Sequence, residues 1–382
     1  MLTQPLNAEP GDYGSIIELT EACFPRDKEL GGMVPRWGHC FRKDRIRNSL
    51  VIRDGEDVVS HVGCIDQTIM VGTGTFRLCG VSSVATRPDH RGRGLMTKLL
   101  NESIGFMKEE GFVLSDLGGD RTRYRRFGWE KAGRTCRFII TPRSLSSGPD
   151  PGNYDVRELT DTSMELSETM DLHNSSRFGL FRDSELHDIL LHRSGKITLM
   201  AWKQGGLDAY AVANIDNEKS VGIDEVGGGA GGVISIIRQL LKDRAETVSI
   251  HLPPRHPLTG PIRTVSSGWS IDTLRMLRIL DLHGLLRDFS NQIGSRIAGL
   301  FPGADIELSL GIEGEDRAIS ISVDSAGIET SEGELRGATV LSGQDMVLLL
   351  FGVCSPDIYS GIPREFSAIL PLDFYLWKNE GV

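Results

Sequence analysis

The sequence predicts a mixed α/β protein built from three consecutive units, at residues 1–142, 153–283 and 284–382. Three observations support this prediction. Short apolar runs alternate with turn residues as in β-strands, while other apolar residues recur at helical spacing. A strand, a glycine turn and a helix follow one another at Val81–Leu100. Serine, proline and glycine gather at residues 142–153, which is the composition of a linker.

Composition narrows the class of protein. The 382 residues are 39% hydrophobic and 25% charged, which is ordinary for a globular protein. No run of eighteen apolar residues and no signal-peptide pattern occurs, so we expect a cytoplasmic protein without a membrane partner. A net charge of −10 makes nucleic acid an unfavourable partner. The cysteines and histidines lack metal-binding spacing, so we expect no metal site.

The first unit is expected to begin with an amphipathic helix at residues 12–24. A polar, broken segment at residues 25–46 follows, of the kind that lines an acceptor site. The remaining expected elements are strands at 49–53 and 58–65 joined by a turn, strands at 66–76 and 78–86, a helix at 95–110, and strands at 112–117 and 134–141.

The stretch around the glycine turn carries the clearest chemistry. Val81–Thr86 is rich in β-branched residues, and Pro88 ends its ladder pairing. Arg91–Gly94 reads Arg-Gly-Arg-Gly and precedes the apolar face of a helix. The first N–H groups of a helix are unpaired and carry partial positive charge, and glycine lets a ligand approach the backbone. The pattern therefore predicts a pyrophosphate site that is neither a Walker loop nor a dinucleotide fingerprint. The alternative is a basic turn without a ligand.

This stretch resembles the acetyl-CoA pyrophosphate loop of the GNAT N-acetyltransferases, whose pattern is Arg/Gln-x-x-Gly-x-Gly/Ala, with the glycines slightly shifted. The resemblance implies that acetyl-CoA is a co-substrate. It also implies that the strand splays from its neighbour, so that free backbone groups hold the pantetheine arm and the thioester. The residues implied to bind acetyl-CoA are Val84, Ala85, Thr86, Arg91, Gly92, Arg93, Gly94, Leu95, Met96, Thr97, Gly119 and Asp120.

A second motif, Tyr124-x-x-Phe-Gly-Trp129, follows a strand and resembles a pattern of the same family. The resemblance implies that Tyr124 is the general acid for the leaving thiolate. A phenol has a pKa of about 10 and a thiol a pKa of about 8.5, so proton transfer from the phenol to the thiolate is unfavourable in free energy. We therefore expect Arg123, Arg125 and Arg126 to strengthen the acidity of this phenol. The alternative is a core tyrosine beside a surface arginine cluster.

The second unit is expected to be a degenerate copy of the first. Its expected helices lie at 160–173, 184–192 and 233–244, and its expected strands at 197–202, 209–215, 220–226 and 248–252. The run Gly227–Gly232 precedes a helix as a phosphate loop would, but it lacks the basic residues that hold a charged ligand. We expect it to be structural.

The third unit resembles the sterol carrier protein fold. A strand at 276–282 is expected to enter it, followed by a helix at 285–301, strands at 305–312, 318–323 and 334–340, and a helix capped by Ser342. The tail from Pro363 to Val382 is apolar and aromatic almost to its end, whereas termini are usually polar. We therefore expect the tail to be docked.

Tandem GNAT-like domains, a sterol carrier-like α+β domain and an apolar tail together resemble the enhanced intracellular survival (Eis) family of acetyltransferases. The resemblance implies a homohexamer and a small-molecule or peptide amine as acceptor, such as an aminoglycoside, a lysine or a polyamine. It implies that the α-carboxylate of Val382 is the base and Tyr124 the acid. The family usually has three consecutive arginines in the loop, whereas Gly92 stands in the middle here.

Several alternatives stay open at this point. The end at Val382 could be docked for packing alone. The chain could be a non-catalytic CoA- or lipid-binding protein whose third unit carries the ligand, in which case we would expect an apolar cavity among residues 285–351. A third alternative is the transfer of longer acyl chains.

Overall fold

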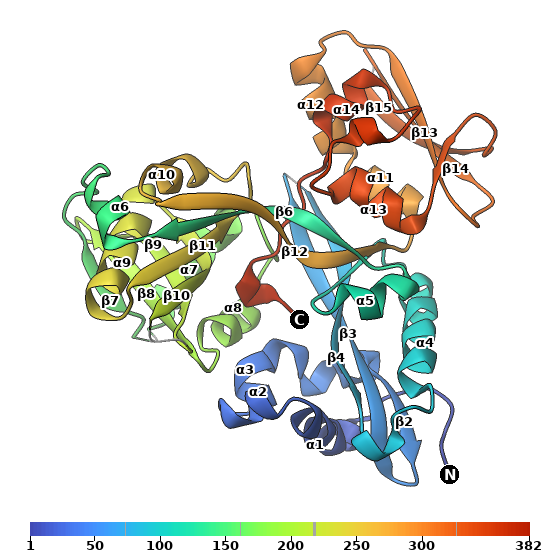
Figure 1. Cartoon of the computed structure of the whole chain (residues 1–382), viewed down its shortest axis with the longest axis horizontal. Helices are drawn as coiled ribbons and strands as arrows, with labels where there is room; N and C mark the ends of the chain where they lie inside the picture. Colours follow the sequence, from blue (N-terminus) through green and yellow to red (C-terminus); the bar gives the residue numbers. More distant parts are fainter. Residues whose placement is uncertain (73, 161, 217–218, 326) are drawn as a thin grey trace.

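The computed structural model describes residues 1–72, 74–160, 162–216, 219–325 and 327–382, and it shows three lobes, two of which share a long sheet (Figure 1). The mixed α/β fold expected from the sequence is confirmed. Two of the predicted elements, the strand at 66–76 and the helix at 160–173, include Thr73 and Asp161, which lie outside the described residues. No helix in the described parts of the chain is long and apolar enough to cross a membrane.

The first lobe begins with a helical layer and a strand hairpin that leads into the glycine turn. Its elements are β1 (Leu6–Asn7), α1 (Tyr13–Cys23), α2 (Pro25–Glu29), α3 (Met33–Trp37), β2 (Leu50–Asp54), β3 (Asp57–Val71), β4 (Gly74–Thr86), α4 (Leu95–Glu109), β5 (Leu114–Leu117), α5 (Arg121–Tyr124) and β6 (Glu130–Ile140). The next helix, α6 (Pro142–Ser146), lies in the second lobe, where Leu145 packs into the core (Figure 1).

The second lobe has the same general order of strands and helices. Its elements are β7 (Asp155–Glu158), α7 (Ser163–Ser175), α8 (Ser184–Leu191), β8 (Lys196–Lys203), β9 (Gly206–Asn214), β10 (Ser220–Gly228), α9 (Ala230–Asp243), β11 (Thr247–Leu252), α10 (Thr259–Thr264) and β12 (Gly268–Ile279).

The third lobe packs helices on a small sheet. Its elements are α11 (Leu282–Asp288), α12 (Ser290–Leu300), β13 (Ile306–Ile312), β14 (Ala318–Asp324), β15 (Gly327–Gly333), β16 (Thr339–Leu341), α13 (Gly343–Phe351) and α14 (Arg364–Ile369). Its strands follow the order β15-β14-β13-β16. As expected, Ser342 caps α13, since its side chain accepts a hydrogen bond from the N–H of Asp345 at 3.1 Å.

Four predicted elements need correction. The strand expected at 66–76 is not separate, because β3 runs unbroken from Asp57 to Val71. The strand expected at 334–340 is largely a turn between β15 and β16, where Gly337 has a φ of +87°. The linker at 142–153 begins with the helix α6, which Thr141 caps. The helix expected at 285–301 is two helices, α11 and α12, with Phe289 between them.

The largest correction concerns β12, part of which was expected at 276–282 to enter the third unit. It lies instead inside the twelve-stranded sheet, whose order is β1-β2-β3-β4-β5-β12-β6-β11-β10-β9-β8-β7. Met276 pairs with Leu117 of β5 on one side and with Lys131 of β6 on the other. The other edge of β6 pairs with β11, with Val248 opposite Ile140. One sheet therefore runs through the first two lobes.

The C-terminal tail connects the three lobes, as the red ribbon in Figure 1 shows. Phe374 and Leu376 pack into the core of the third lobe, whereas Tyr375 and Trp377 pack into the core of the second. Trp377 is fully buried, and its indole N–H donates to the carbonyl of Phe178 at 3.2 Å. Burial of such aromatic side chains stabilises the docked tail by roughly 1.5–3 kcal/mol each.

Candidate active site

The strands β4 and β5 separate beside the glycine turn. They pair in parallel from Leu78 opposite Leu114 to Val81 opposite Leu117, where β5 ends. β4 continues to Thr86, with an irregularity in its pairing with β3 and a left-handed φ of +51° at Ser83. Beyond Val81, β5 therefore offers no partner to the backbone of β4, and that edge can bind a ligand.

The glycine turn leads directly into the N-terminus of α4. Gly92 and Gly94 have φ values of +75° and +73°, a conformation that favours glycine. A Cβ at either position would meet nothing within 4 Å, so the backbone is open to a ligand. The backbone N–H of Lys98 makes the first helical hydrogen bond, to the carbonyl of Gly94 at 3.1 Å. The N–H groups of Leu95, Met96 and Thr97 come before it and therefore have no partner within the helix.

A cavity of about 510 Å³, which we call the loop cavity, lies where the turn meets β4. Its lining residues are Cys23, Phe24, Val84, Ala85, Thr86, His90, Arg91, Gly92, Gly94, Leu95, Met96, Thr97, Arg123 and Arg126. Nine of the twelve residues implied to bind acetyl-CoA belong to this lining. Sequence analysis did not predict Cys23 and Phe24, which come from the end of α1; Cys23 Sγ donates to the carbonyl of Thr86 at 3.4 Å.

The loop cavity fits a diphosphate in charge and shape. Arg91 Nε donates to the carbonyl of Thr86 at 3.1 Å, which holds the guanidinium beside the strand edge. Arg126 Nη2 donates to Thr97 Oγ1 at 3.3 Å, beside the first turn of α4. The loop cavity thus has three arginines (Arg91, Arg123 and Arg126) and three helix N–H groups around it. Gly92 and Gly94 have no side chains that would block the backbone between them. This is the donor set that binds phosphate groups.

The other three implied residues lie outside the lining. Arg93 is exposed on the turn. Asp120 caps α5, since its Oδ1 accepts from the N–H of Thr122 at 2.8 Å. Gly119 has a φ of +149°, and a Cβ there would lie 2.8 Å from Cε2 of Tyr124. Gly119 and Asp120 therefore support the tyrosine rather than the loop cavity.

Tyr124 is buried at the end of α5, and its surroundings differ from the expected ones. Burial raises the pKa of the Tyr124 phenol above 10, although Arg123 acts in the opposite direction. Arg125 is engaged elsewhere, since its Nε lies 3.2 Å from Glu130 Oε2, and Arg126 contacts Thr97. Arg123 lowers the pKa of this phenol as expected, but burial outweighs its effect, and the net shift is upward. The phenol is protonated at neutral pH.

The end of the chain lies over the point where β4 and β5 separate. A Cβ at Gly80 of β4 would be 2.8 Å from Val382 Cγ2 and 2.8 Å from Gln67 Oε1. A Cβ at Gly118, just past β5, would be 3.7 Å from the backbone oxygen of Val382. The side chain of Val382 thus packs in the space that Gly80 leaves open, and its backbone oxygen lies near Gly118.

Hydrogen bonds from several elements hold the last residues of the tail. His39 Nε2 lies 3.0 Å from the carbonyl of Gly381. Arg193 Nη1 donates to the carbonyl of Asn379 at 2.5 Å, and Lys196 Nζ donates to the Asn379 side chain at 2.9 Å. Burial holds the pKa of His39 well below 6.5, so its ring is neutral at neutral pH. Hydrogen bonds from the first lobe (His39) and the second lobe (Arg193 and Lys196) therefore fix the residues just before Val382.

A buried ion network, which no motif in the sequence indicates, anchors Glu380. Arg182 Nη2 lies 2.6 Å from both Glu225 and Glu380, and all three side chains are fully buried. Tyr210 donates to Glu225 at 2.6 Å. Burial alone would raise the pKa of Glu225, but Arg182 and His173 hold it well below 4.5. Burial raises the pKa of Glu380 despite the opposing effect of Arg182.

The same network brings together atoms of the kinds that ligate metals, which the sequence spacing did not reveal. Ligand atoms of His173, Glu225 and Glu380 lie within 4.8 Å of one another. Both carboxylates already bind the guanidinium of Arg182, and its positive charge competes with a cation. The arrangement is therefore an internal ion pair network.

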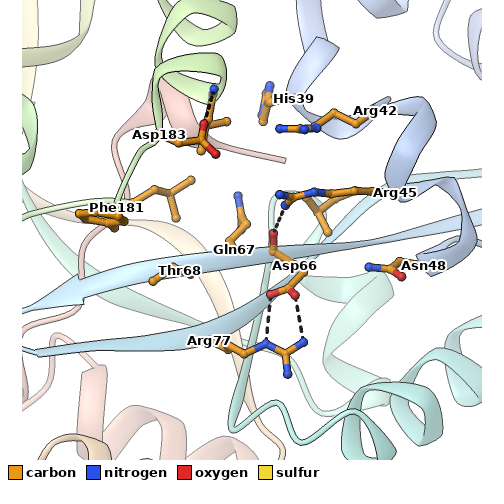
Figure 2. A pocket seen from close by; sticks show the side chains of 13 residues that line it. His39, Arg42, Arg45, Asn48, Asp66, Gln67, Thr68, Arg77, Phe181 and Asp183 are labelled. Atoms are coloured by element: carbon orange, nitrogen blue, oxygen red, sulfur yellow. Dashed lines mark hydrogen bonds and ion pairs between the residues drawn. The ribbon is translucent and has the colours of Figure 1, made fainter. Parts of the chain in front are cut away.

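A second cavity, of about 460 Å³, lies beside the end of the tail, and we call it the central pocket (Figure 2). His39 and Gln67, which both lie next to the last tail residues, are part of its lining. Its other lining residues are Arg42, Arg45, Asn48, Ile65, Asp66, Thr68, Arg77, Leu180, Phe181, Asp183 and Leu186. His39, Arg42 and Arg45 of this lining come from the segment at 25–46.

The charges around the central pocket are largely paired. Arg77 Nη2 lies 2.9 Å from Asp66, and Arg42 Nη2 lies 2.8 Å from Glu185. Arg45 donates to the carbonyl of Asp66 at 3.4 Å, and Figure 2 shows its side chain reaching across the pocket. Asp183 caps α8, since its Oδ1 accepts from the N–H of Leu186 at 2.8 Å. The pocket thus combines charged groups of both signs with apolar side chains such as Phe181.

The second glycine run, Gly227–Gly232, holds an internal anion. The N–H of Gly232 donates to Asp208 Oδ2 at 3.1 Å, at the N-terminus of α9. A Cβ at Gly229 would lie 2.6 Å from the same carboxylate oxygen. The Asp208 carboxylate thus occupies the place where a phosphate would bind, which supports a structural role for the run.

Comparisons with known proteins agree with this geometry. Residues 6–132 match the family model described as an acetyltransferase (GNAT) domain. A GCN5-related N-acetyltransferase from Kribbella flavida superimposes with a TM-score of 0.70 at 18% identity, over 98% of this chain and 97% of that one. Eis1 from Mycobacterium abscessus gives 0.66 at 12% identity, over 98% and 99%.

A conserved protein of unknown function from Enterococcus faecalis V583, described as a probable N-acyltransferase, gives a TM-score of 0.72 at 16% identity over 98% and 97% of the two chains. At these identities the solved structures establish a shared fold over nearly the whole chain. No curated protein sequence matches this chain. The chain therefore has a GNAT domain in its first lobe, within an architecture that solved structures share.

Proposed function

We propose that the protein is an acetyltransferase that moves the acetyl group of acetyl-CoA to an amine. The observation that carries this proposal is the loop cavity, where a splayed strand, a glycine turn, three arginines and a helix N-terminus meet. The fit of that cavity to a diphosphate supports acetyl-CoA as the co-substrate. The match of residues 6–132 to a GNAT domain supports the same conclusion.

We assign the binding roles from the geometry of the cavity. The N–H groups of Leu95–Thr97 and the guanidiniums of Arg91 and Arg126 hold the diphosphate. The thioester lies along Val84–Thr86, where backbone N–H groups polarise its carbonyl and stabilise the negative charge that develops there. Gly92 and Gly94 let the diphosphate reach the backbone.

The acceptor amine attacks the thioester carbonyl directly, without an acyl-enzyme intermediate. A C–N bond forms and the C–S bond breaks. The α-carboxylate of Val382 accepts the proton that the nitrogen loses, and Tyr124 gives its proton to the departing thiolate. Two features support these roles. Val382 lies where β4 and β5 separate, and the Tyr124 phenol is protonated at neutral pH.

In this proposal the second lobe does not bind a second co-substrate. It positions the tail that carries the base, the α-carboxylate of Val382. The Arg182–Glu225–Glu380 network fixes the tail, and Asp208 fills the second glycine run. The three domains are 1–142, 153–283 and 284–382, although β12 and β6 cross the first boundary within the sheet. The third domain is sterol carrier-like, and the assembly is a homo-oligomer, a hexamer by resemblance to the Eis family.

The central pocket takes the acceptor, a small-molecule or peptide amine. It lies next to the chain end, and Asp183, which uses one carboxylate oxygen to cap α8, has a second oxygen that can accept a hydrogen bond from the amine. The lipid-binding alternative lacks a specific observation in its favour. Leu285, Phe289 and Phe351 of the third lobe are fully buried in one core cluster.

The test is thiol release from acetyl-CoA with a panel of amines, namely an aminoglycoside, a lysine peptide and a polyamine. We expect release above the amine-free rate with at least one of them, and an acetylated amine by mass spectrometry. Isothermal calorimetry with acetyl-CoA alone separates binding from turnover. An absence of heat at millimolar acetyl-CoA would overturn the proposal, whereas binding without turnover would favour the non-catalytic alternative.

A further inference from the structure

A third cavity lies away from the loop cavity, at the place where the three lobes and the tail meet. It has a volume of about 330 Å³, and its lining includes Arg177, Arg255, Arg296, Asp288 and Asp373. Arg177 and Arg255 come from loops of the second lobe, Arg296 comes from α12, and Asp373 comes from the start of the tail. We call this cavity the arginine pocket.

One carboxylate serves several arginines in the arginine pocket. Arg296 forms an ion pair with Asp373, and its Nη1 donates to the carbonyls of Ile369 at 2.6 Å and Pro371 at 2.9 Å. The Arg296 side chain is only 8% exposed. Arg255 Nε lies 3.9 Å from the same Asp373 carboxylate. The negative charge of Asp373 is thus shared between two guanidiniums.

Arg134 of β6 does not line the pocket, but its charge interacts with those of Asp373, Arg255 and Arg296. Burial lowers the pKa of Arg134, and the attraction of Asp373 does not restore it, because Arg255 and Arg296 repel its charge. Arg177, an exposed residue with a left-handed φ of +62°, adds a further positive charge at the rim of the arginine pocket. Burial also raises the pKa of Asp288, which reduces its tendency to carry a negative charge.

Among the described residues, three arginines and two aspartates therefore line the arginine pocket, in a chain whose net charge is −10. Partly buried positive charges are costly unless an anion pairs with them. Guanidinium groups bind oxyanions through parallel N–H donors, and these bonds are stronger where water is excluded. Asn291 and Ser295 also line the pocket and add uncharged polar groups.

We propose that the arginine pocket binds a small oxyanion with at least two negative charges, such as inorganic phosphate or the phosphate group of a small metabolite. Such an anion adds negative charge to a pocket whose lining has more positive than negative side chains. It also bridges all three lobes and the start of the tail, and therefore stabilises their junction. This site is independent of the proposed acetyl transfer.

The test uses the full chain saturated with CoA, so that the loop cavity cannot contribute. Isothermal calorimetry and thermal unfolding are measured with inorganic phosphate, and with sodium chloride at equal ionic strength. We expect one phosphate per chain and a higher Tm than in chloride. A sugar phosphate in a parallel titration distinguishes free phosphate from a phosphorylated metabolite by its relative affinity.

Two variants shift the binding in opposite directions. Arg255→Ala, at a half-exposed loop residue, is expected to weaken phosphate binding by roughly tenfold or more, since it removes a charge-assisted hydrogen-bond donor. Asp373→Asn is expected to tighten binding, because it removes the competing carboxylate. Arg263→Ala, at an exposed arginine of α10, is the matched control and leaves the affinity unchanged. Equal Tm values in phosphate and chloride, or equal phosphate affinity in all variants, would overturn the proposal.

Discussion

Arg182 and Glu380 form an ion pair at 2.6 Å, with both side chains fully buried, although they are 198 residues apart in the sequence. Such a pair gains little net stability, because removing two charges from water costs about as much as their attraction returns. Its main effect here is on geometry. Glu380 is two residues from the chain end, so the pair fixes the position of Val382 over the separated strands.

The first prediction concerns this pair. Arg182→Met leaves Glu225 and Glu380 buried without their partner, and we expect it to lower the free energy of unfolding by roughly 3–5 kcal/mol. Arg244→Ala removes an exposed ion pair with Glu158 and is the control, with an expected loss of about 1 kcal/mol or less. Urea denaturation measures both. Equal losses for the two variants would contradict a structural role for the buried pair.

The second prediction tests whether Glu380 positions the tail for activity or is needed only for folding. Glu380→Gln keeps the shape of the side chain but weakens its hold on Arg182. We expect kcat to fall while KM for acetyl-CoA and the secondary structure stay unchanged, because the loop cavity is not touched. Steady-state kinetics and circular dichroism measure these quantities. A rise in KM for acetyl-CoA with no fall in kcat would show that the network does not act through the chain end.

The third prediction concerns Tyr124 as the proposed general acid. Tyr124→Phe removes the phenolic proton, and we expect kcat to fall by about 10²–10⁴-fold with unchanged affinity for acetyl-CoA. Tyr13→Phe, in α1, is the control and keeps full activity. Because the pKa of Tyr124 is raised above 10, its deprotonation is expected to leave the rate unaffected below pH 10. A wild-type rate in Tyr124→Phe would remove this residue from the mechanism.

The fourth prediction uses the glycine beneath the chain end. Gly80→Ala places a methyl group 2.8 Å from Val382 Cγ2, so we expect the chain end to move and kcat to fall while acetyl-CoA still binds. Gly105→Ala in α4 is the matched control, because its Cβ meets nothing within 4 Å. It is expected to stabilise the protein by about 0.5–1 kcal/mol. Full activity in Gly80→Ala would contradict a role for Val382.

The fifth prediction concerns acid stability. Burial lowers the pKa of His256 from 6.5 to about 4. The unfolded chain therefore binds a proton below pH 6.5 that the folded chain binds only near pH 4, so stability is lost as the pH falls through this window. His256→Phe is expected to reduce that loss by about 1.4 kcal/mol per pH unit. Urea denaturation at pH 7, 6 and 5 measures the slope, and an unchanged slope would contradict the prediction.

The sequence predicted the parts of the site that are local. The strand, turn and helix from Val84 to Thr97 are contiguous, and their glycines, arginines and helical spacing are visible without a structure. The docked tail was predictable from its apolar composition. Tyr124 was singled out by its motif. The arginines beside it in the sequence suggested a lowered pKa, whereas burial, which the sequence does not show, raises the pKa of Tyr124.

The parts that were not predicted depend on contacts between distant residues. Arg182, Glu225 and Glu380 look like surface residues in the sequence, because charged side chains are seldom fully buried. The lining of the central pocket comes from separate segments, and its paired charges appear only when these meet. β12 was misplaced because its partners in β5 and β6 lie more than a hundred residues earlier.

The position of β12 determines how the protein can be made. β5 and β6 flank a gap that is filled only after the residues up to Ile279 have left the ribosome. A chain shortened to end at the first linker lacks a central strand of its own sheet. The acetyltransferase-like lobe is therefore not a detachable module, and its maturation waits for the synthesis of the second lobe.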